Sequence, residues 1–199
     1  RVVGLTSSNN IISSNDLSGN NQGVFIGGAD KVGDGNTISN NNLSNSSAMG
    51  ITASGEVTIL TNDYTDSNSG VSLKYLDGYT FGPMDFSSYN IKYNVLAIHN
   101  SNNVTVTGVN ASGPAGYTSG MGISITETTN STITGNTVHN RQSGFVIQGM
   151  GTSNNTVSSN DFSDNGYGMY LTDGYNIIGA GNVISANNLT NSKGWAIYM

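Results

Sequence analysis

Four ionisable residues occur at comparable places in four separate segments of the chain. Lys74 and His99 each follow directly after a triplet with apolar residues at its first and third positions, and Glu127 and Asp173 each lie one position further on. If these triplets are equivalent strands of a repeat, the four side chains share one edge. Glu127 and Asp173 are then two repeats apart, or roughly 10 Å at the backbone.

This edge could support two kinds of chemistry. Two carboxyl groups about 6.5–9.5 Å apart suit an inverting glycosidase, so Glu127 and Asp173 could act as general acid and base. Alternatively, His99 or Lys74 could remove a proton next to a uronate carboxylate, which is lyase or epimerase chemistry, or Lys74 could bind that carboxylate. The competing interpretation is that these are solvated turn residues on an exposed edge.

The segment from 74 to 93 is rich in aromatic and acidic residues and interrupts the repeat. Aromatic rings stack on sugars and carboxylates bond hydroxyl groups, so this segment is predicted to be a substrate-binding insertion. Its candidate residues are Tyr75, Asp77, Tyr79, Phe81 and Asp85. The alternative is a loop that packs its aromatics on the side of the solenoid, or a disguised turn. Tyr117, in a milder insertion over 112–122, is expected to border the same groove.

Weaker candidates lie elsewhere. His139 and Arg141 flank a corner of the sixth repeat and could bind an acidic sugar, although a solvated corner explains them as well. Asp30 and Asp34 lie in a Gly-rich turn whose oxygen ligands could hold Ca²⁺. Asp34-Gly35 is also an ordinary turn dipeptide. No other cofactor is predicted.

A repeat of roughly 21 to 27 residues positions all these groups. In most copies an Asn precedes an apolar residue by two positions, and after a short gap the copy closes on Gly-apolar-x-apolar. The closing strands begin at or near Gly23, Gly50, Gly70, Leu96, Gly122, Gly144, Gly168 and Gly194. Apolar and polar residues alternate within each copy, which is strand spacing and not helix spacing. Three short strands per copy and right-handed crossovers predict an all-β, right-handed parallel β-helix of about eight three-stranded turns.

One asparagine column supports this fold. Asn tolerates the left-handed backbone of a sharp corner, and stacked amides can hydrogen-bond from turn to turn. The column contains Asn15, Asn41, Asn62, Asn136, Asn160 and Asn187. Val109 occupies the same slot in the fifth copy and is expected to interrupt the ladder.

The pattern resembles the parallel β-helix repeat of pectate-lyase-like proteins over nearly the whole chain. Segments such as Tyr175-Asn176-Ile177-Ile178-Gly179-Ala180-Gly181-Asn182 are typical of Asn-rich members of that superfamily. The Asn/Ser-rich character is similar to archaeal cell-envelope β-helices, and within them to the disaggregatase-related group. This resemblance implies action on a polysaccharide at the cell surface or outside the cell. It supplies no catalytic motif that can be matched residue by residue.

The composition limits the classes of partner that the chain is expected to bind. The chain of 199 residues has a net charge of −6 and only six Lys and Arg, so nucleic acid is a poor candidate. No apolar run is long enough to span a membrane. Residues 1–199 are expected to form one domain, as a fragment of a longer protein or with its ends covered by homo-oligomerisation.

Two functions from different classes compete. The first is a polysaccharide-degrading hydrolase or lyase acting on an extracellular, uronate-containing polymer. The second is a non-catalytic surface β-helix that binds glycans or spaces other domains. An ice-binding solenoid would need a flat outward Thr array in every turn, and the outward positions along the sequence are irregular.

Overall fold

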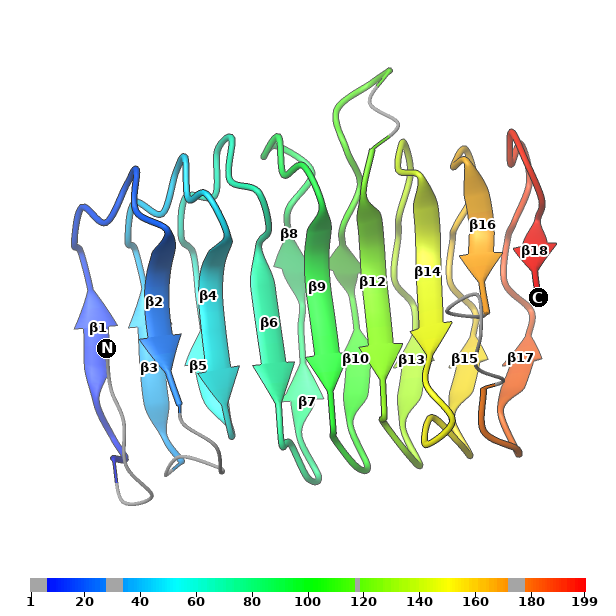
Figure 1. The fold of residues 1–199 in the computed structure, drawn as a ribbon, viewed down its shortest axis with the longest axis horizontal. Coiled ribbons are helices and arrows are strands. Elements are labelled where there is room, and N and C mark those ends of the chain that lie inside the picture. Colours follow the sequence, from blue (N-terminus) through cyan, green and yellow to red (C-terminus); the bar gives the residue numbers. More distant parts are fainter. Residues whose placement is uncertain (1–6, 28–33, 117–118, 172–177) are drawn as a thin grey trace.

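The chain forms a coil of parallel strands. The computed structural model describes residues 7–27, 34–116, 119–171 and 178–199, and all regular elements within these ranges are β-strands. The axis of the coil runs horizontally in Figure 1, and each turn brings the chain back beside the preceding turn. The pairings between strands are parallel, for example β12 with β9 and with β14. The predicted parallel β-helix is confirmed.

One side of the coil is a single sheet of eight strands, which we call the long sheet. Each of its strands comes from a different turn. In chain order they are β2 (Gln22–Ile26), β4 (Met49–Ser54), β6 (Val71–Lys74), β9 (Asn94–His99), β12 (Met121–Thr126), β14 (Ser143–Gln148), β16 (Tyr167–Tyr170) and β18 (Ile197–Tyr198).

The opposite side of the coil is divided into two sheets. The first contains β1 (Ile11–Ser13), β3 (Asn36–Ser39) and β5 (Val57–Ile59). The second contains β7 (Thr80–Phe81), β10 (Thr105–Thr107), β13 (Thr132–Thr134), β15 (Thr156–Ser158) and β17 (Val183–Ser185). No strand pairing joins β5 to β7. The third side of each turn is mostly a single bridge residue, and among the described residues only β8 (Met84–Asp85) and β11 (Val109–Asn110) form a strand pair there.

Inward side chains form continuous rows along the axis. Ile12 lies in register with Ile38, and Val106 lies in register with Ile133, which in turn aligns with Val157. Ile38, Ile133 and Val157 are fully buried. Burial of each such side chain contributes about 1.5–3 kcal/mol, so the rows hold the turns together. Gly122 is the glycine of the closing pattern in its turn. The position requires glycine because a Cβ there would clash with Val138 in the core.

The asparagine column forms a hydrogen-bonded ladder in two sections. The Nδ2 of Asn41 donates to Oδ1 of Asn62 at 3.0 Å, and the Nδ2 of Asn136 donates to Oδ1 of Asn160 at 2.9 Å. Val109 interrupts the ladder as predicted, and Met84, its register partner, also lacks a side-chain amide. The Val109 backbone N–H still donates to Oδ1 of Asn136 at 2.9 Å.

The segment from 74 to 93 is a turn of the coil, so its interpretation as an insertion is wrong. Its strands β7 and β8 pair with β10 and β11. Phe81 is buried in register with Val106, and Phe86 is also fully buried. Phe81 fills an inward position that Val106, Ile133 and Val157 fill in the following turns, which disguised the repeat in the sequence.

The last turn has a different register from the one predicted. Met169 pairs with Ile197, so Ala196 and not Gly194 is the counterpart of Gly168. The preceding bridge pairs Asp161 with Asn188, and the path from there to the long sheet is one residue longer in the last turn. The extra residue in this corner shifts the register of β18 from the predicted one, and an apolar residue, Ile197, still pairs with Met169.

Candidate functional site

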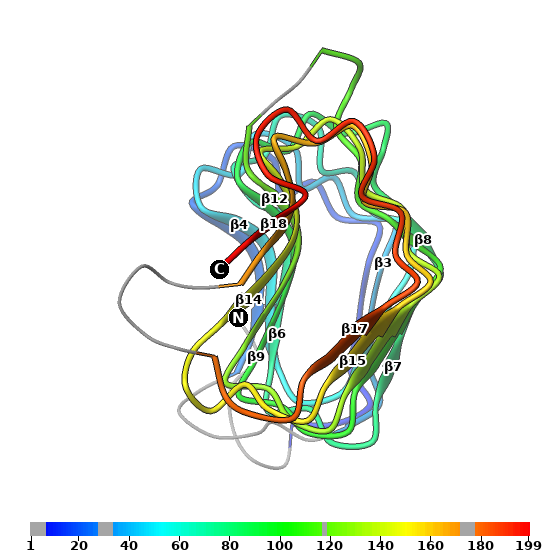
Figure 2. The same cartoon turned by 90° about the vertical axis from the view of Figure 1, so that its right-hand side faces the viewer.

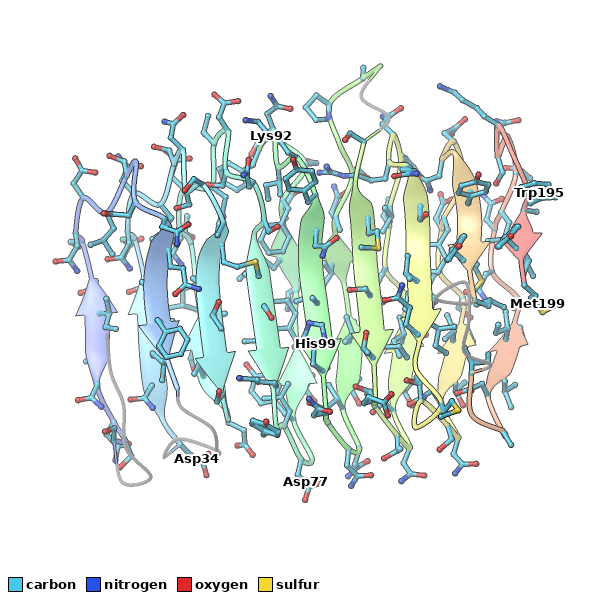
Figure 3. All side chains as sticks on the ribbon, viewed as in Figure 1. Asp34, Asp77, Lys92, His99, Trp195 and Met199 are labelled. Atoms are coloured by element: carbon cyan, nitrogen blue, oxygen red, sulfur yellow. The ribbon has the colours of Figure 1, made fainter. Side chains whose placement is uncertain are left out.

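A row of polar side chains crosses the outer face of the long sheet. Lys74 pairs in register with His99, His99 with Thr126, and Thr126 with Gln148. Each follows a buried residue at the end of a strand, so alternation places it on the outer surface. The sequence prediction that Lys74 and His99 lie side by side is thus supported by the register. Figure 3 shows His99 on this face near the middle of the molecule.

His99 has an environment that favours its neutral form. Burial lowers the pKa of His99 below its ordinary value of 6.5, and the positive charge of Lys74 lowers it further. Lys74 itself lies with its Nζ 5.4 Å from the centroid of the Tyr75 ring. The site therefore combines a neutral imidazole, which can accept a proton near pH 7, with a neighbouring cation that can hold a carboxylate.

Glu127 lies on the same edge but points away from this pair. Its backbone has a φ of 49° at the left-handed corner, and its side chain is exposed. The carboxylate lies over Gly149 and Gly151 of the following turn, where a Cβ on either glycine would clash with its oxygens. His99 is in the preceding turn. Asp173, its predicted partner, lies outside the described residues, so the hydrolase pair stays a prediction.

A hollow of about 540 Å³ opens on the same face, beyond the polar row. Its lining combines aromatic rings and side-chain amides, which are the usual groups that stack on and hydrogen-bond to sugars. The lining includes Tyr93, Asn94, Gln142, Gln148, Tyr167 and Tyr170. Gln148 belongs to the polar row as well, two strands from His99, or roughly 10 Å. The hollow and the Lys74–His99 pair therefore share one continuous surface.

Aromatic stacking extends the hollow toward the C-terminal end. Tyr167 stacks on Trp195 with ring centroids 5.8 Å apart, and Tyr170 stacks on Tyr198 at 4.9 Å. Trp195 is 57% exposed and lies at the right-hand end of Figure 3. These aromatic residues are not among the candidates predicted from the sequence. The signal was present, because outward positions of two successive long-sheet strands both carry aromatics.

Apart from Tyr75, the predicted substrate-binding residues of 74–93 do not lie beside the Lys74–His99 pair. Tyr75 lies beside Lys74, but Phe81 is in the core and the Tyr79 hydroxyl donates to the Val57 carbonyl at 2.5 Å. Phe81 therefore cannot contact a substrate at the surface, and that prediction is wrong. Asp77 accepts a hydrogen bond from Asn102 at another corner, and Asp85 caps a turn through the Ser87 N–H.

The acidic-sugar prediction for Arg141 is also wrong. Arg141 is fully buried, and its guanidinium donates to the carbonyls of Ala111, Ile91 and Ser112. A buried cation needs hydrogen-bond partners, and backbone oxygens from two other turns supply them here, which residue spacing could not reveal.

His139 and the calcium candidates have other surroundings. The Nε2 of His139 lies 3.2 Å from Oδ2 of Asp161. Burial raises the pKa of Asp161, but the hydrogen bonds from Ser163 and the contact with His139 outweigh burial and lower the pKa overall. Asp34 is exposed at a corner, and within the described ranges no group of three or more His, Cys, Asp or Glu could hold a metal ion. Asp30 and Tyr117 lie outside the described residues.

Comparison with known families agrees with this geometry. The model of the right-handed beta helix region matches residues 85–199, more than half of the chain. The chain belongs to this right-handed β-helix family. No curated protein matches it. The resemblance to pectate-lyase-like proteins is thus confirmed at the level of the fold, whereas nothing supports the disaggregatase-related group.

Two solved structures from Azotobacter vinelandii share the fold. They are the A-module of mannuronan C-5 epimerase AlgE4, with a TM-score of 0.61 and 12% identity, and the A-module of AlgE6, with 0.53 and 17%. The alignments cover the whole of this chain but only 56% and 59% of those chains. At this identity the likeness concerns the fold. No helix long and apolar enough to cross a membrane is found among the described residues.

Proposed function

We propose that the chain binds an acidic extracellular polysaccharide across the outer face of the long sheet and removes a proton from a uronate unit at His99. The observation that carries this proposal is the pairing of Lys74 with His99 on an open face that continues into an aromatic and amide-lined hollow. Lysine would hold the uronate carboxylate and stabilise the charge that develops when the neighbouring carbon loses its proton.

We favour proton abstraction over hydrolysis because Lys74 and His99 lie side by side in the long sheet. Hydrolysis needs two carboxyl groups on either side of the scissile bond. In the described part of this edge, the residues in register with Glu127 are Gly55, Tyr75, Asn100 and Gly149, none of which carries a carboxyl, and the predicted partner Asp173 lies outside the described residues. A neutral His99 with a lowered pKa is instead suited to act as a general base. The likeness to two uronate-modifying enzymes is consistent with this choice.

The hollow supports binding of several sugar units. Tyr167 and Tyr170 would stack on pyranose faces, and the amides of Gln142 and Gln148 would bond hydroxyl groups. A non-catalytic glycan-binding role is the second candidate, because the stacked aromatics lie several strands away from Lys74 and His99.

The decisive experiment uses polymannuronate and polygalacturonate in D₂O with the 199-residue chain. Deuterium incorporated at C5 without chain cleavage indicates epimerisation, whereas absorbance of an unsaturated uronate indicates a lyase. Whichever of the two signals the unchanged chain gives should disappear in His99→Gln. Thr126→Ala changes the neighbour of His99 in the polar row and should retain most activity. Binding on affinity gels without either signal would leave the glycan-binding role, and absence of both binding and turnover would overturn the proposal.

A further inference from the structure

The sheet opposite the long sheet presents a regular grid of hydroxyl groups. In β10, β13 and β15 the central residues Val106, Ile133 and Val157 are buried, so both flanking residues of each strand face outward. All six flanking residues are Thr or Ser. The grid consists of Thr105, Thr107, Thr132, Thr134, Thr156 and Ser158.

Register makes the grid two straight columns. Thr105, Thr132 and Thr156 align in one column, and Thr107, Thr134 and Ser158 align in the other. Thr80 continues the first column and Ser185 continues the second. In Figure 2, viewed along the axis, β7, β15 and β17 of this sheet nearly superimpose, as expected for a sheet with little twist.

The hydroxyls of the grid are available to a partner, and the branched threonine side chains that carry most of them have few rotamers. Within the described ranges, none of the six side-chain hydroxyls forms a hydrogen bond to another residue. Thr is branched at Cβ, which restricts its χ1 angle and fixes the hydroxyl and methyl groups on a strand. A partner would therefore meet preordered donors and acceptors at little entropic cost.

The face is also electrically neutral. The segments 103–108, 130–135 and 154–159, which contain the grid and its two corners, include no charged residue although the chain carries a net charge of −6. They include no aromatic residue either, whereas the aromatics suited to sugar rings lie on the long sheet. The complementary partner is a neutral, regularly repeating surface of hydrogen-bonding groups.

The spacing matches ordered water. Hydroxyls of neighbouring turns are about 4.7–4.9 Å apart, and those within one strand are about 6.7 Å apart. In ice each oxygen has tetrahedral neighbours at about 2.8 Å, which places second-neighbour oxygens about 4.6 Å apart. We propose that this face adsorbs to ice through the hydroxyl grid. The outward positions are irregular over the chain as a whole, as expected from the sequence, but the consecutive turns that contain β10, β13 and β15 supply a regular array.

The test measures inhibition of ice recrystallisation and thermal hysteresis by the 199-residue chain. Thr132→Tyr places a bulky ring at the centre of the grid and should reduce both activities to the level of serum albumin. Thr52→Tyr is the matched control, because it faces outward on the long sheet beside Phe25 and should retain wild-type activity. Thr132→Val, which keeps the shape and removes the hydroxyl, should lose activity even if the Tyr variant misfolds.

Three outcomes would overturn the inference. They are a wild-type chain no more active than albumin, equal loss in Thr52→Tyr and Thr132→Tyr at unchanged melting temperature, or no loss in Thr132→Val. Cosedimentation with microcrystalline chitin or cellulose that is abolished by Thr132→Tyr, in a chain without ice activity, would assign the face to a crystalline polymer. These results are independent of the uronate assays, since the two faces lie on opposite sides of the coil.

Discussion

At the scale of single residues, neighbours in adjacent turns decide the chemistry of a side chain. His99 and Lys74 are 25 positions apart in the sequence, yet they are register partners on one surface. Burial and this neighbour together lower the pKa of His99. The same side chain on an isolated, solvated corner would titrate near 6.5.

Replacing Lys74 with Met should raise the pKa of His99 toward its ordinary value. Removing the positive charge abolishes one of the two causes that lower the pKa, and burial remains, so the value should still lie below 6.5. NMR titration of the His99 ring protons measures the shift. Lys92→Met removes an exposed cation from another corner and should leave the titration unchanged. A shift of equal size in both variants would contradict the assignment.

Arg141 is a structural residue whose loss should be costly. Arg141→Met leaves the carbonyls of Ala111, Ile91 and Ser112 without their donor in the core. Each unsatisfied buried group costs about 1–3 kcal/mol, partly offset by no longer burying a charge, so a loss of about 3 kcal/mol is expected. Urea denaturation measures it. Lys193→Met, at an exposed position, should change stability by less than about 0.5 kcal/mol.

At the scale of elements, side-chain hydrogen bonds at the corners join successive turns, as the backbone hydrogen bonds of the strands do. The side chain of Asn160 donates to Asn187, Ile133 and Ser158 and accepts from both nitrogens of Asn136. One amide therefore links three successive turns. Where Met84 and Val109 replace asparagine, this linkage is lost.

Asn160→Ala should therefore destabilise the chain by about 2–4 kcal/mol, because buried partners in two turns lose their hydrogen bonds. The matched control is Asn188→Ala, an exposed asparagine whose side chain bonds Thr190 and Asp161 at the outer corner. Its loss should cost about 1 kcal/mol or less. Equal urea midpoints for the two variants would show that the ladder adds no stability.

At the scale of the whole molecule, the coil consists of two blocks on one side and a single sheet on the other. β5 and β7 do not pair, and the bridges of Asp63 and Asp85 run to Asn42 and Asn110, away from each other. A cleft of about 380 Å³ lined by Leu60, Pro83 and Met84 opens there. The long sheet crosses this boundary through the pairing of β4 with β6.

Hydrogen exchange should reveal this boundary. Stability in a solenoid is a sum of contacts between neighbouring turns, so a weakened contact should open more often. Amides of 57–64 should exchange faster than those of the equivalent segment 131–138, as measured by mass spectrometry of peptides from each. Equal protection of the two segments would show that the blocks open together.

The spacing of residue types along the chain was enough to predict the coil. Alternating apolar residues and asparagines at fixed offsets specify inward rows and corners, because only stacked turns bury those rows. That is why the β-helix, the Ile and Val rows, the interrupted asparagine ladder and the adjacency of Lys74 and His99 followed from spacing alone.

The surroundings of each side chain became known from the folded coil and not from the spacing. The sequence could not show that Phe81 fills an aliphatic slot or that Arg141 turns inward. Nor could it show that Tyr167, Tyr170 and Trp195 gather around one hollow. The physical reason is that spacing fixes the order of residues along a turn. Exposure, pairing and the direction of a long side chain depend on atoms contributed by the turns above and below.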